Sequence, residues 1–300
     1  MKITITGTSG FVGKNLIPYL ESRLFEVNSL SMRNPDWIQQ FPLKSDVLIH
    51  LAGKAHDTSN TDAEEEYFQV NRDLTIALFQ QFLKSDIKDF FYFSSVKAVA
   101  DRVEGILTED VSGNPQTAYG RSKWEAEQFL LKQQLPTGKR LFIIRPCMIH
   151  GPGNKGNLNL LYKVVKNGIP WPLAAFSNER SFLSIDNLNY LIAEMILHKE
   201  TASGVYHFSD DDALSTNELI LLINKTLGKK AKLWNISKKM IEKTAKMGDF
   251  LYLPLNSERL KKLTESYRVS NNKIKSELGI NSLPLTVQEG LQRTVKSFDK

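Results

Sequence analysis

The stretch Thr6-Gly7-Thr8-Ser9-Gly10-Phe11-Val12-Gly13 joins an apolar run to an amphipathic one, and it decides the fold. Residues 2–6, which lead into it, are rich in Ile and Thr, as β-branched residues of a short strand are. Residues 11–24 place apolar side chains three and four positions apart, which predicts a helix. A glycine-rich turn between a strand and a helix predicts a site for a dinucleotide.

Three glycines in this stretch suit contact with a pyrophosphate. They are Gly7, Gly10 and Gly13, and they allow a tight turn, a close approach of the backbone to phosphate oxygens, and close packing of the helix on the strand. The positive end of the helix then faces the phosphates. A purely structural turn is the alternative. We expect cofactor contacts from most of the turn: Gly7, Ser9, Gly10, Phe11, Val12 and Gly13.

Strand-like and helix-like patterns alternate through the first half of the chain. Further strands are predicted at residues 26–30, 47–51, 90–94 and 141–145. Further helices are predicted at residues 62–84 and 119–134. This alternation predicts an α/β fold of the Rossmann type, a doubly wound parallel sheet with helices on both faces.

The pattern changes after Pro146. Residues 151–156 have the composition of a loop, and helices are predicted near residues 186–198, 215–227 and 237–246. We therefore divide the chain into an NAD(P)-binding Rossmann domain, residues 1–150, and a smaller mixed α/β C-terminal substrate lobe, residues 151–300. Some segments of the second part are expected to return to the main sheet. The lobe is expected to close over the carboxyl edge of that sheet, where such folds bind ligands.

Composition places the chain among ordinary globular proteins. It has 300 residues, of which 41% are hydrophobic and 24% charged. The sequence shows neither an apolar run of about 20 residues nor a signal peptide, and Cys147 is its single cysteine, so we expect a cytoplasmic protein without membrane contact, disulfides or a metal site. The net charge of +6 owes much to lysines between residues 225 and 246. We interpret them as a solvated surface and expect no nucleic acid; nucleic-acid binding and mild steering of an anionic substrate are the other readings.

The residues after the second predicted strand bear on the choice of cofactor. Sheets that bind NAD usually carry an acidic residue there, which bonds the ribose hydroxyls. This chain has Ser31-Met32-Arg33 instead, and a guanidinium suits the 2′-phosphate of NADP(H). Asp36 is close by, and an ordinary surface position is the alternative for Arg33. The sequence therefore predicts NAD(P), with a lean towards NADP(H).

A Tyr-x-x-x-Lys pair is the candidate for proton transfer. Tyr119 and Lys123 are four residues apart on a predicted helix, so they share one face. An ammonium near a phenol favours the phenolate, and we expect it to lower the pKa of Tyr119. Such a tyrosine can exchange a proton with a sugar hydroxyl while hydride moves to a nicotinamide. Ser95, at the end of the preceding strand, can hold the substrate oxygen beside it.

The chain resembles the extended short-chain dehydrogenases/reductases, in the branch called the NAD-dependent epimerase/dehydratase family. The resemblance covers nearly the whole chain, and its motifs are specific for the family but less so for the reaction. Besides the glycine turn and the Tyr-x-x-x-Lys pair, the motifs are Asp46-Val47-Leu48-Ile49-His50-Leu51-Ala52-Gly53, Val70-Asn71, Ser94-Ser95-Val96-Lys97, and Arg145-Pro146 through Gly151-Pro152-Gly153.

The resemblance implies a role for each matching residue. The catalytic set is Ser95, Tyr119 and Lys123, of which Lys123 also bonds the nicotinamide ribose. The positions that line the cofactor are Leu51, Ala52, Gly53 and Pro146. The positions that bind substrate are Ser95, Asn157, Leu158 and Arg180. Arg180 matches the arginine that grips a diphosphate, a task that suits a planar guanidinium; a surface ion pair is its alternative.

The sequence also departs from the family pattern. Leu74 stands where a Gly is frequent, Val99-Ala100 where Tyr-Gly is usual, and His150 where a Tyr is frequent. The segment of residues 31–45 is shorter than usual, which puts contacts on the adenine side in doubt.

Two residues after Ser95 narrow the reaction. The 4,6-dehydratases of the family carry an Asp-Glu pair there, and this chain has Val96-Lys97, so the resemblance sets dehydration aside. It implies hydride transfer at C4 of a nucleotide-diphosphate sugar, by a 4-keto reductase or a 4-epimerase, in the synthesis of surface polysaccharide precursors. A reductase or isomerase of a non-nucleotide substrate and a non-catalytic NADP-sensing protein are the alternatives. By the same analogy we expect a homodimer.

Overall fold

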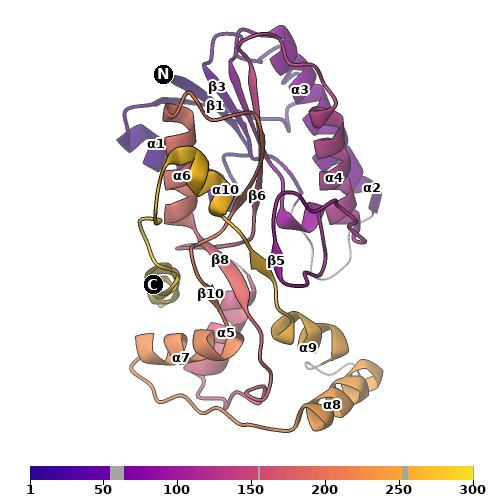
Figure 1. Cartoon of the computed structure of the whole chain (residues 1–300), viewed down its shortest axis with the longest axis vertical. Coiled ribbons are helices and arrows are strands. Elements are labelled where there is room, and N and C mark those ends of the chain that lie inside the picture. Colours follow the sequence, from indigo (N-terminus) through magenta and orange to yellow (C-terminus); the bar gives the residue numbers. More distant parts are fainter. Residues whose placement is uncertain (55–63, 155, 252–255, 300) are drawn as a thin grey trace.

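The computed structural model describes residues 1–54, 64–154, 156–251 and 256–299. A six-stranded parallel sheet forms the centre of its larger lobe, with strand order β2-β1-β3-β4-β6-β9 (Figure 1). The strands are β1 (Lys2–Thr6), β2 (Glu26–Leu30), β3 (Val47–His50), β4 (Asp89–Phe93), β6 (Arg140–Pro146) and β9 (Gly204–Phe208). The predicted Rossmann-type sheet is therefore confirmed.

Helices cover both faces of this sheet (Figure 1). One face carries α1 (Phe11–Ser22), α6 (Ile185–Leu197) and α10 (Asn272–Leu278). The other carries α3 (Leu74–Lys84) and α4 (Ala118–Leu131). Strand β4 shows why both faces need cover: Phe91 and Phe93 point into the first core, and Phe90 and Tyr92 into the second.

The smaller lobe is built on a short mixed sheet. Its strands are β7 (Met148–His150), β8 (Arg180–Ser184) and β10 (Ala213–Leu214), where β8 runs parallel to β7 and antiparallel to β10. Its helices are α5 (Asn157–Lys166), α7 (Thr216–Thr226), α8 (Lys238–Leu251), α9 (Ser257–Thr264) and α11 (Val287–Ser297). A separate apolar core fills the space between these elements. A small parallel ribbon pairs β5 (Ile106–Leu107) with β11 (Arg268–Val269).

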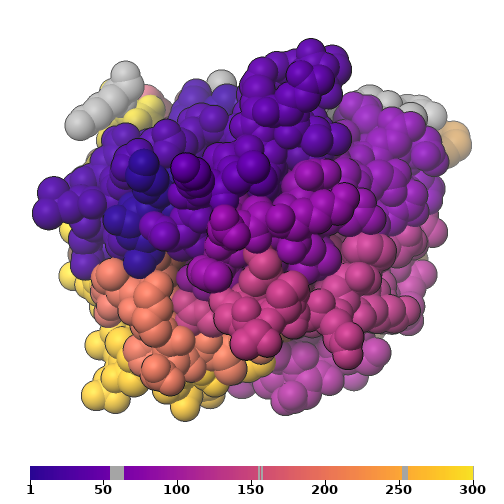
Figure 2. All heavy atoms as spheres, turned by 90° about the horizontal axis from the view of Figure 1, so that it is seen from above, coloured from indigo at the N-terminus to yellow at the C-terminus, as the bar shows by residue number. Residues whose placement is uncertain are grey.

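The chain passes between the two lobes more than once. After β7 and β8 it returns to the larger lobe as α6, which packs on α1, and as β9, which pairs with β6 at the sheet edge. Viewed from the end that carries the larger lobe, segments from late in the sequence border those of the first half (Figure 2). The division at residue 150 thus stays an interpretation of the sequence, with α6, β9 and α10 belonging to the main layer.

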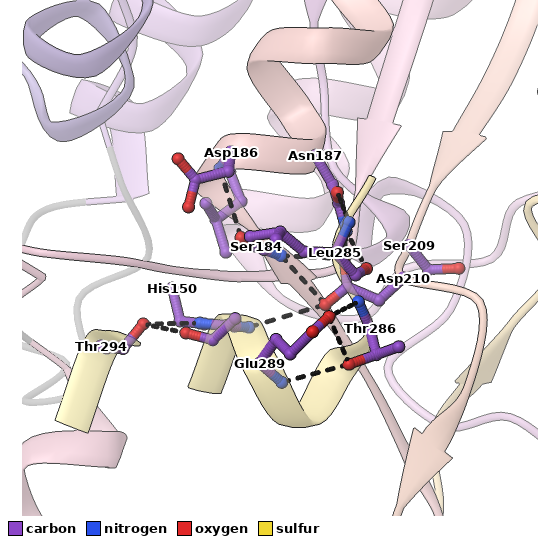
Figure 3. Close-up of polar contacts among 12 residues, drawn as sticks. His150, Ser184, Asp186, Asn187, Ser209, Asp210, Leu285, Thr286, Glu289 and Thr294 are labelled. Atoms are coloured by element: carbon purple, nitrogen blue, oxygen red, sulfur yellow. Dashed lines mark hydrogen bonds and ion pairs between the residues drawn. The ribbon is translucent and has the colours of Figure 1, made fainter. Parts of the chain in front are cut away.

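A buried polar network joins the main sheet to the smaller lobe (Figure 3). Asp210 follows β9 and accepts hydrogen bonds from the backbone N–H of Ser184 at 3.0 Å and from Asn187 Nδ2 at 2.7 Å. His150 Nε2 lies 3.7 Å from Asp210 Oδ2, and His150 Nδ1 contacts Thr294 Oγ1 of α11 at 2.9 Å. Since these side chains are buried, the network fixes the ends of β7, β8 and β9 against α11.

The structure contains a helical segment at each place where the sequence predicts one in the first half, with one local difference. The helical segment before α3 comprises α2 (Glu64–Tyr67) and a π-helical turn, η1 (Phe68–Asp73). The start of the predicted 62–84 helix, residues 62 and 63, lies outside the described residues. In the described part of the chain, no helix is both long and apolar enough to cross a membrane.

Candidate active site

The glycine turn after β1 is held tightly against the turn after β3. Gly7 adopts a φ of +70°, and a Cβ atom there would lie 2.5 Å from the backbone nitrogen of Ala52. A Cβ on Gly13 would lie 2.7 Å from Thr8 Cα. Gly10 caps α1 and has no side chain that could bond to the free N–H groups of the first turn. This open, positively polarised helix start fits the pyrophosphate of a dinucleotide.

A series of hydrogen bonds links Ala52 to buried side chains of β1, β3 and α3. The Ala52 N–H donates to Thr6 Oγ1 at 3.2 Å, Thr6 contacts His50 Nδ1 at 2.7 Å, and His50 Nε2 contacts Thr75 Oγ1 at 2.9 Å. Thr75 in turn donates to the carbonyl of Asn71 at 2.8 Å. Burial lowers the pKa of His50 to about 3, so its imidazole is neutral and links the two hydroxyls as one donor and one acceptor.

Asn71, in the π-helical turn, ties the segment after β3 to helix α4. Its side-chain oxygen accepts from the Lys54 N–H at 2.8 Å, and its Nδ2 donates to the Lys54 carbonyl and to Ser122 Oγ, each at 3.1 Å. A π-turn inside a helix is frequent at functional sites. Here it places one amide between the predicted cofactor segment and the helix that carries the Tyr-x-x-x-Lys pair.

Ser95 and Tyr119 meet at the carboxyl edge of the sheet. Ser95 follows β4 and caps the short helix η2 (Val96–Ala98), where its Oγ accepts from the Lys97 N–H at 3.1 Å. Tyr119 lies in the first turn of α4, and its phenol is close enough to Ser95 for that side chain to affect its pKa. Burial raises the pKa of Tyr119, although Ser95 opposes the rise. The expected lowering of this pKa by Lys123 was therefore wrong, because desolvation dominates and the Lys123 ammonium is bonded to the Phe93 carbonyl.

Lys123 is buried between the sheet and the cofactor segment. Its ammonium donates to the carbonyl of Phe93 at 2.9 Å and lies 5.0 Å from the ring centre of Tyr92. A Cβ on Gly53 would lie 3.0 Å from Asn71 Oδ1 and 3.1 Å from Lys123 Nζ, so a larger residue there would crowd both side chains. Burial lowers the pKa of Lys123 to about 8, and the negative charge of Glu127 opposes this.

Glu127 belongs to a buried ion pair beneath these residues. It lies one helical turn beyond Lys123, and Arg145 of β6 reaches it in a bidentate arrangement, with Nε 3.0 Å from Oε1 and Nη2 2.5 Å from Oε2. Both side chains are nearly fully buried. The pair therefore holds α4 against the end of β6, where Pro146 follows directly.

The site opens into a cleft of about 990 Å³ between the two lobes. Tyr119 and Lys97 line it from the larger lobe, and Arg180 and Tyr267 line it from the other side. Arg180 Nη1 donates to the carbonyl oxygens of two residues at and just after the end of α9, Lys262 and Glu265. The structure thus brings two predicted site residues, Tyr119 and Arg180, into one cleft.

The other predicted positions lie around this cleft or apart from it. Arg33 is exposed in the turn after β2, and Pro146 is buried at the end of β6. Asn157 begins helix α5. The side chain of Leu158 is buried in the core of the smaller lobe, so a contact of this residue with substrate would have to come from its main chain. Within residues 1–54, 64–154, 156–251 and 256–299, no cluster of side chains could hold a metal ion.

Comparison with known proteins identifies the family to which the chain belongs. The model of the NAD dependent epimerase/dehydratase family matches residues 3–207, which span the sheet, the glycine turn and the Tyr-x-x-x-Lys pair. The chain belongs to the NAD dependent epimerase/dehydratase family. Membership makes it an NAD(P)-dependent enzyme.

Individual members of the family share the whole length of the chain. A UDP-glucose 4-epimerase from Vibrio cholerae is 32% identical over 99% of this chain and 95% of its own. The fold is shared with RMD from Pseudomonas aeruginosa complexed with NADPH, at a TM-score of 0.77 and 20% identity, covering 99% of both chains. It is also shared with UDP-glucuronic acid 4-epimerase from Bacillus cereus in complex with NAD, at a TM-score of 0.75 and 17% identity, covering 100% of this chain and 99% of the other.

Sequence reasoning missed the residues that support the family's site from within. Glu127 continues the four-residue spacing of Tyr119 and Lys123 along α4, and this spacing was a usable signal for it. Its partner Arg145 stood in a quoted motif but was given no role. His50 and Asn71 also stood in such motifs, but their links to Thr75 and Ser122 could not be predicted, since these join segments far apart in the sequence.

Proposed function

We propose that the protein transfers hydride at C4 of a nucleotide-diphosphate sugar, as a 4-keto reductase or a 4-epimerase. The observation that carries this proposal is the closeness of Ser95 and Tyr119 at the sheet edge, with Tyr119 lining the same cleft as Arg180. Hydride chemistry needs a proton donor or acceptor at the reacting oxygen, and a diphosphate needs a cation at a distance from it.

In the proposed reaction, Tyr119 exchanges a proton with the oxygen on C4, and Ser95 holds that oxygen by a hydrogen bond. The bound nicotinamide supplies or accepts the hydride. A raised pKa keeps Tyr119 protonated near neutral pH, which is the state that reduction of a carbonyl requires. Lys123, beside Gly53, would bind the nicotinamide ribose and keep the ring in reach of the sugar.

Arg180 would bind the substrate diphosphate. Its guanidinium is anchored to backbone carbonyls and has no carboxylate partner within ion-pair distance among the described residues. A cation held in this way is free to pair with an anionic ligand. The UDP-sugar names of the relatives from Vibrio cholerae and Bacillus cereus support a nucleotide-sugar substrate. The product would serve as a precursor of surface polysaccharide, Asn157 and Leu158 would add contacts to the phosphates, and the enzyme would act as a homodimer.

Two features shape the finer assignment. Val96 and Lys97 occupy the positions after Ser95, and neither side chain is a carboxyl acid, which argues against dehydration. Arg33 is exposed beyond β2, where a 2′-phosphate would lie, which favours NADP(H). The two structural relatives hold NADPH and NAD respectively, so the family accommodates either cofactor.

Analysis of the cofactor that copurifies with the protein tests this proposal. The protein is denatured and the supernatant is assayed for NAD(H) and NADP(H), and the native protein is assayed with UDP-sugars and with a UDP-4-keto sugar. Stoichiometric NAD with interconversion of C4 epimers identifies an epimerase. Oxidation of NADPH only with the 4-keto sugar identifies a reductase. Cofactor binding without turnover of any sugar nucleotide would contradict the proposal and favour a sensor or an enzyme of non-nucleotide substrates.

A further inference from the structure

Lys97 is a cation of the cleft that neither the fold nor the proposed proton transfer uses. It lies two residues after Ser95, and its backbone N–H is bonded to Ser95 Oγ at 3.1 Å. Its position is therefore fixed relative to the residue that would hold the reacting oxygen. The side chain is half-buried and lines the cleft together with Tyr119.

The ammonium of Lys97 is held in place but is not neutralised. It donates one hydrogen bond, to the carbonyl of Asp101 at 2.9 Å, and lies 4.2 Å above the ring of Tyr267. The carboxylate of Asp101 is turned to other donors, the N–H of Gln116 at 2.7 Å and the hydroxyl of Thr117 at 3.4 Å. Within the described residues, no carboxylate lies within ion-pair distance of Lys97. Two of its three N–H donors are thus left for a ligand.

Tyr267 makes this position rigid. Its hydroxyl donates towards the carbonyls of Ala100 at 2.7 Å and Val96 at 3.2 Å, which belong to the same turn as Lys97. The ring therefore forms the base on which the lysine side chain rests, and its face attracts the cation. Burial lowers the pKa of Lys97 to about 8; the negative charge of Asp101 opposes this, and the positive charge of Arg180 adds to it. A ligand oxygen with negative charge would offset both the loss of hydration on burial and the repulsion from Arg180.

Resting on the function proposed above, we propose that Lys97 determines substrate specificity by binding the carbonyl oxygen of a substituent on the sugar ring, close to the reacting carbon. The chemistry is that of an acyl-type oxygen, present in an acetamido group or in a C6 carboxylate. A partly desolvated ammonium gains more from such an acceptor than from a neutral hydroxyl. Arg180 is left for the diphosphate, because it is anchored to a carbonyl of α9 and not to the turn that carries Lys97.

Binding of four related ligands tests this inference. Dissociation constants of UDP, UDP-glucose, UDP-N-acetylglucosamine and UDP-glucuronic acid are measured by calorimetry on the cofactor-loaded protein. The two acyl-bearing sugars separate an acetamido group from a carboxylate, and UDP-glucose lacks both. We expect the wild type to bind one acyl-bearing sugar at least about 10-fold more tightly than UDP-glucose, because the site is built to bond that oxygen.

Three variants make the test specific to Lys97. Lys97→Met should reduce this preference to within about threefold, and Lys97→Arg should retain part of it. Lys132→Met, at the exposed end of α4, is the matched control and should keep the wild-type preference. A wild type without preference, or a Lys97→Met variant that weakens all three sugars alike, would overturn the inference. Failure of the wild type to bind even UDP would instead overturn the proposed function for UDP-sugars, and the inference with it.

Discussion

The charged side chains at the floor of the site and those on the wall of its cleft are treated in opposite ways. On the floor, Arg145 and Glu127 neutralise each other in a bidentate pair that is almost fully buried. On the wall, Lys97 and Arg180 are anchored by backbone carbonyls and face the cleft without an ion-pair partner among the described residues. Charges that are paired inside the protein hold its elements together, and charges left unpaired at a cleft are available to a ligand.

Removal of one partner of the floor pair should give the largest effect. Glu127→Leu leaves Arg145 buried without its counter-ion, and we expect the free energy of unfolding to fall by about 3–5 kcal/mol. Denaturant titration of the cofactor-free protein measures this loss.

Two controls separate the buried charge from other effects of this substitution. The double variant Glu127→Leu/Arg145→Met removes both charges and should recover a large part of the lost stability. Glu125→Gln, on the same helix as Glu127, breaks an exposed pair with Arg72 of η1 and should cost less than about 1 kcal/mol. An equal loss in the single and double variants would show that the pair is not what holds α4 to β6.

At the junction of floor and wall, Tyr119→Phe should abolish most turnover. The phenol is the proposed proton donor, so kcat should fall by about 10²- to 10⁴-fold. The aromatic ring stays, so thermal stability and binding of the cofactor, followed by fluorescence titration, should change little. Turnover within a few-fold of the wild type would exclude Tyr119 as the acid/base.

On the wall, Arg180→Gln should weaken substrate binding rather than chemistry. Loss of the guanidinium removes a contact proposed to be equal in the ground and transition states, so KM should rise by about 10-fold or more while kcat changes little. Steady-state kinetics with the best sugar nucleotide measures both constants. Arg268→Gln, which removes an exposed arginine paired with Glu179, is the matched control. An unchanged KM in Arg180→Gln would argue for a substrate without a diphosphate.

The same contrast explains how much the sequence could predict. The inner strands β3, β4 and β6 were predictable because both of their faces are buried, and this produces continuous apolar runs flanked by amphipathic helices. Strand β9 was not predicted, because its run Gly204–Phe208 contains Gly and His and lies among helices of the second half. Its place in the sheet depends on pairing with β6, which lies about 60 residues earlier in the chain.

The candidate site was predictable to a similar degree and for a similar reason. Tyr119 and Lys123 follow from local spacing, and Gly7 from local turn chemistry. The direction of the pKa shift of Tyr119 did not follow, because it depends on how deeply the cleft edge buries the phenol. The environment of Lys97 also escaped prediction, since it combines a turn of the larger lobe with Tyr267 from far along the sequence.

The return of β9 to the sheet has a consequence for how proteins of this shape can be altered. A chain cut after residue 150 would lose the strand that pairs with β6, and the exposed edge would invite aggregation. Residues 151–300 are therefore not a module that can be exchanged intact, because β9 and α6 among them belong to the main layer. Lys97, on the cleft wall, is not part of the buried pair of Arg145 and Glu127, so it can be substituted without removing either of those charges.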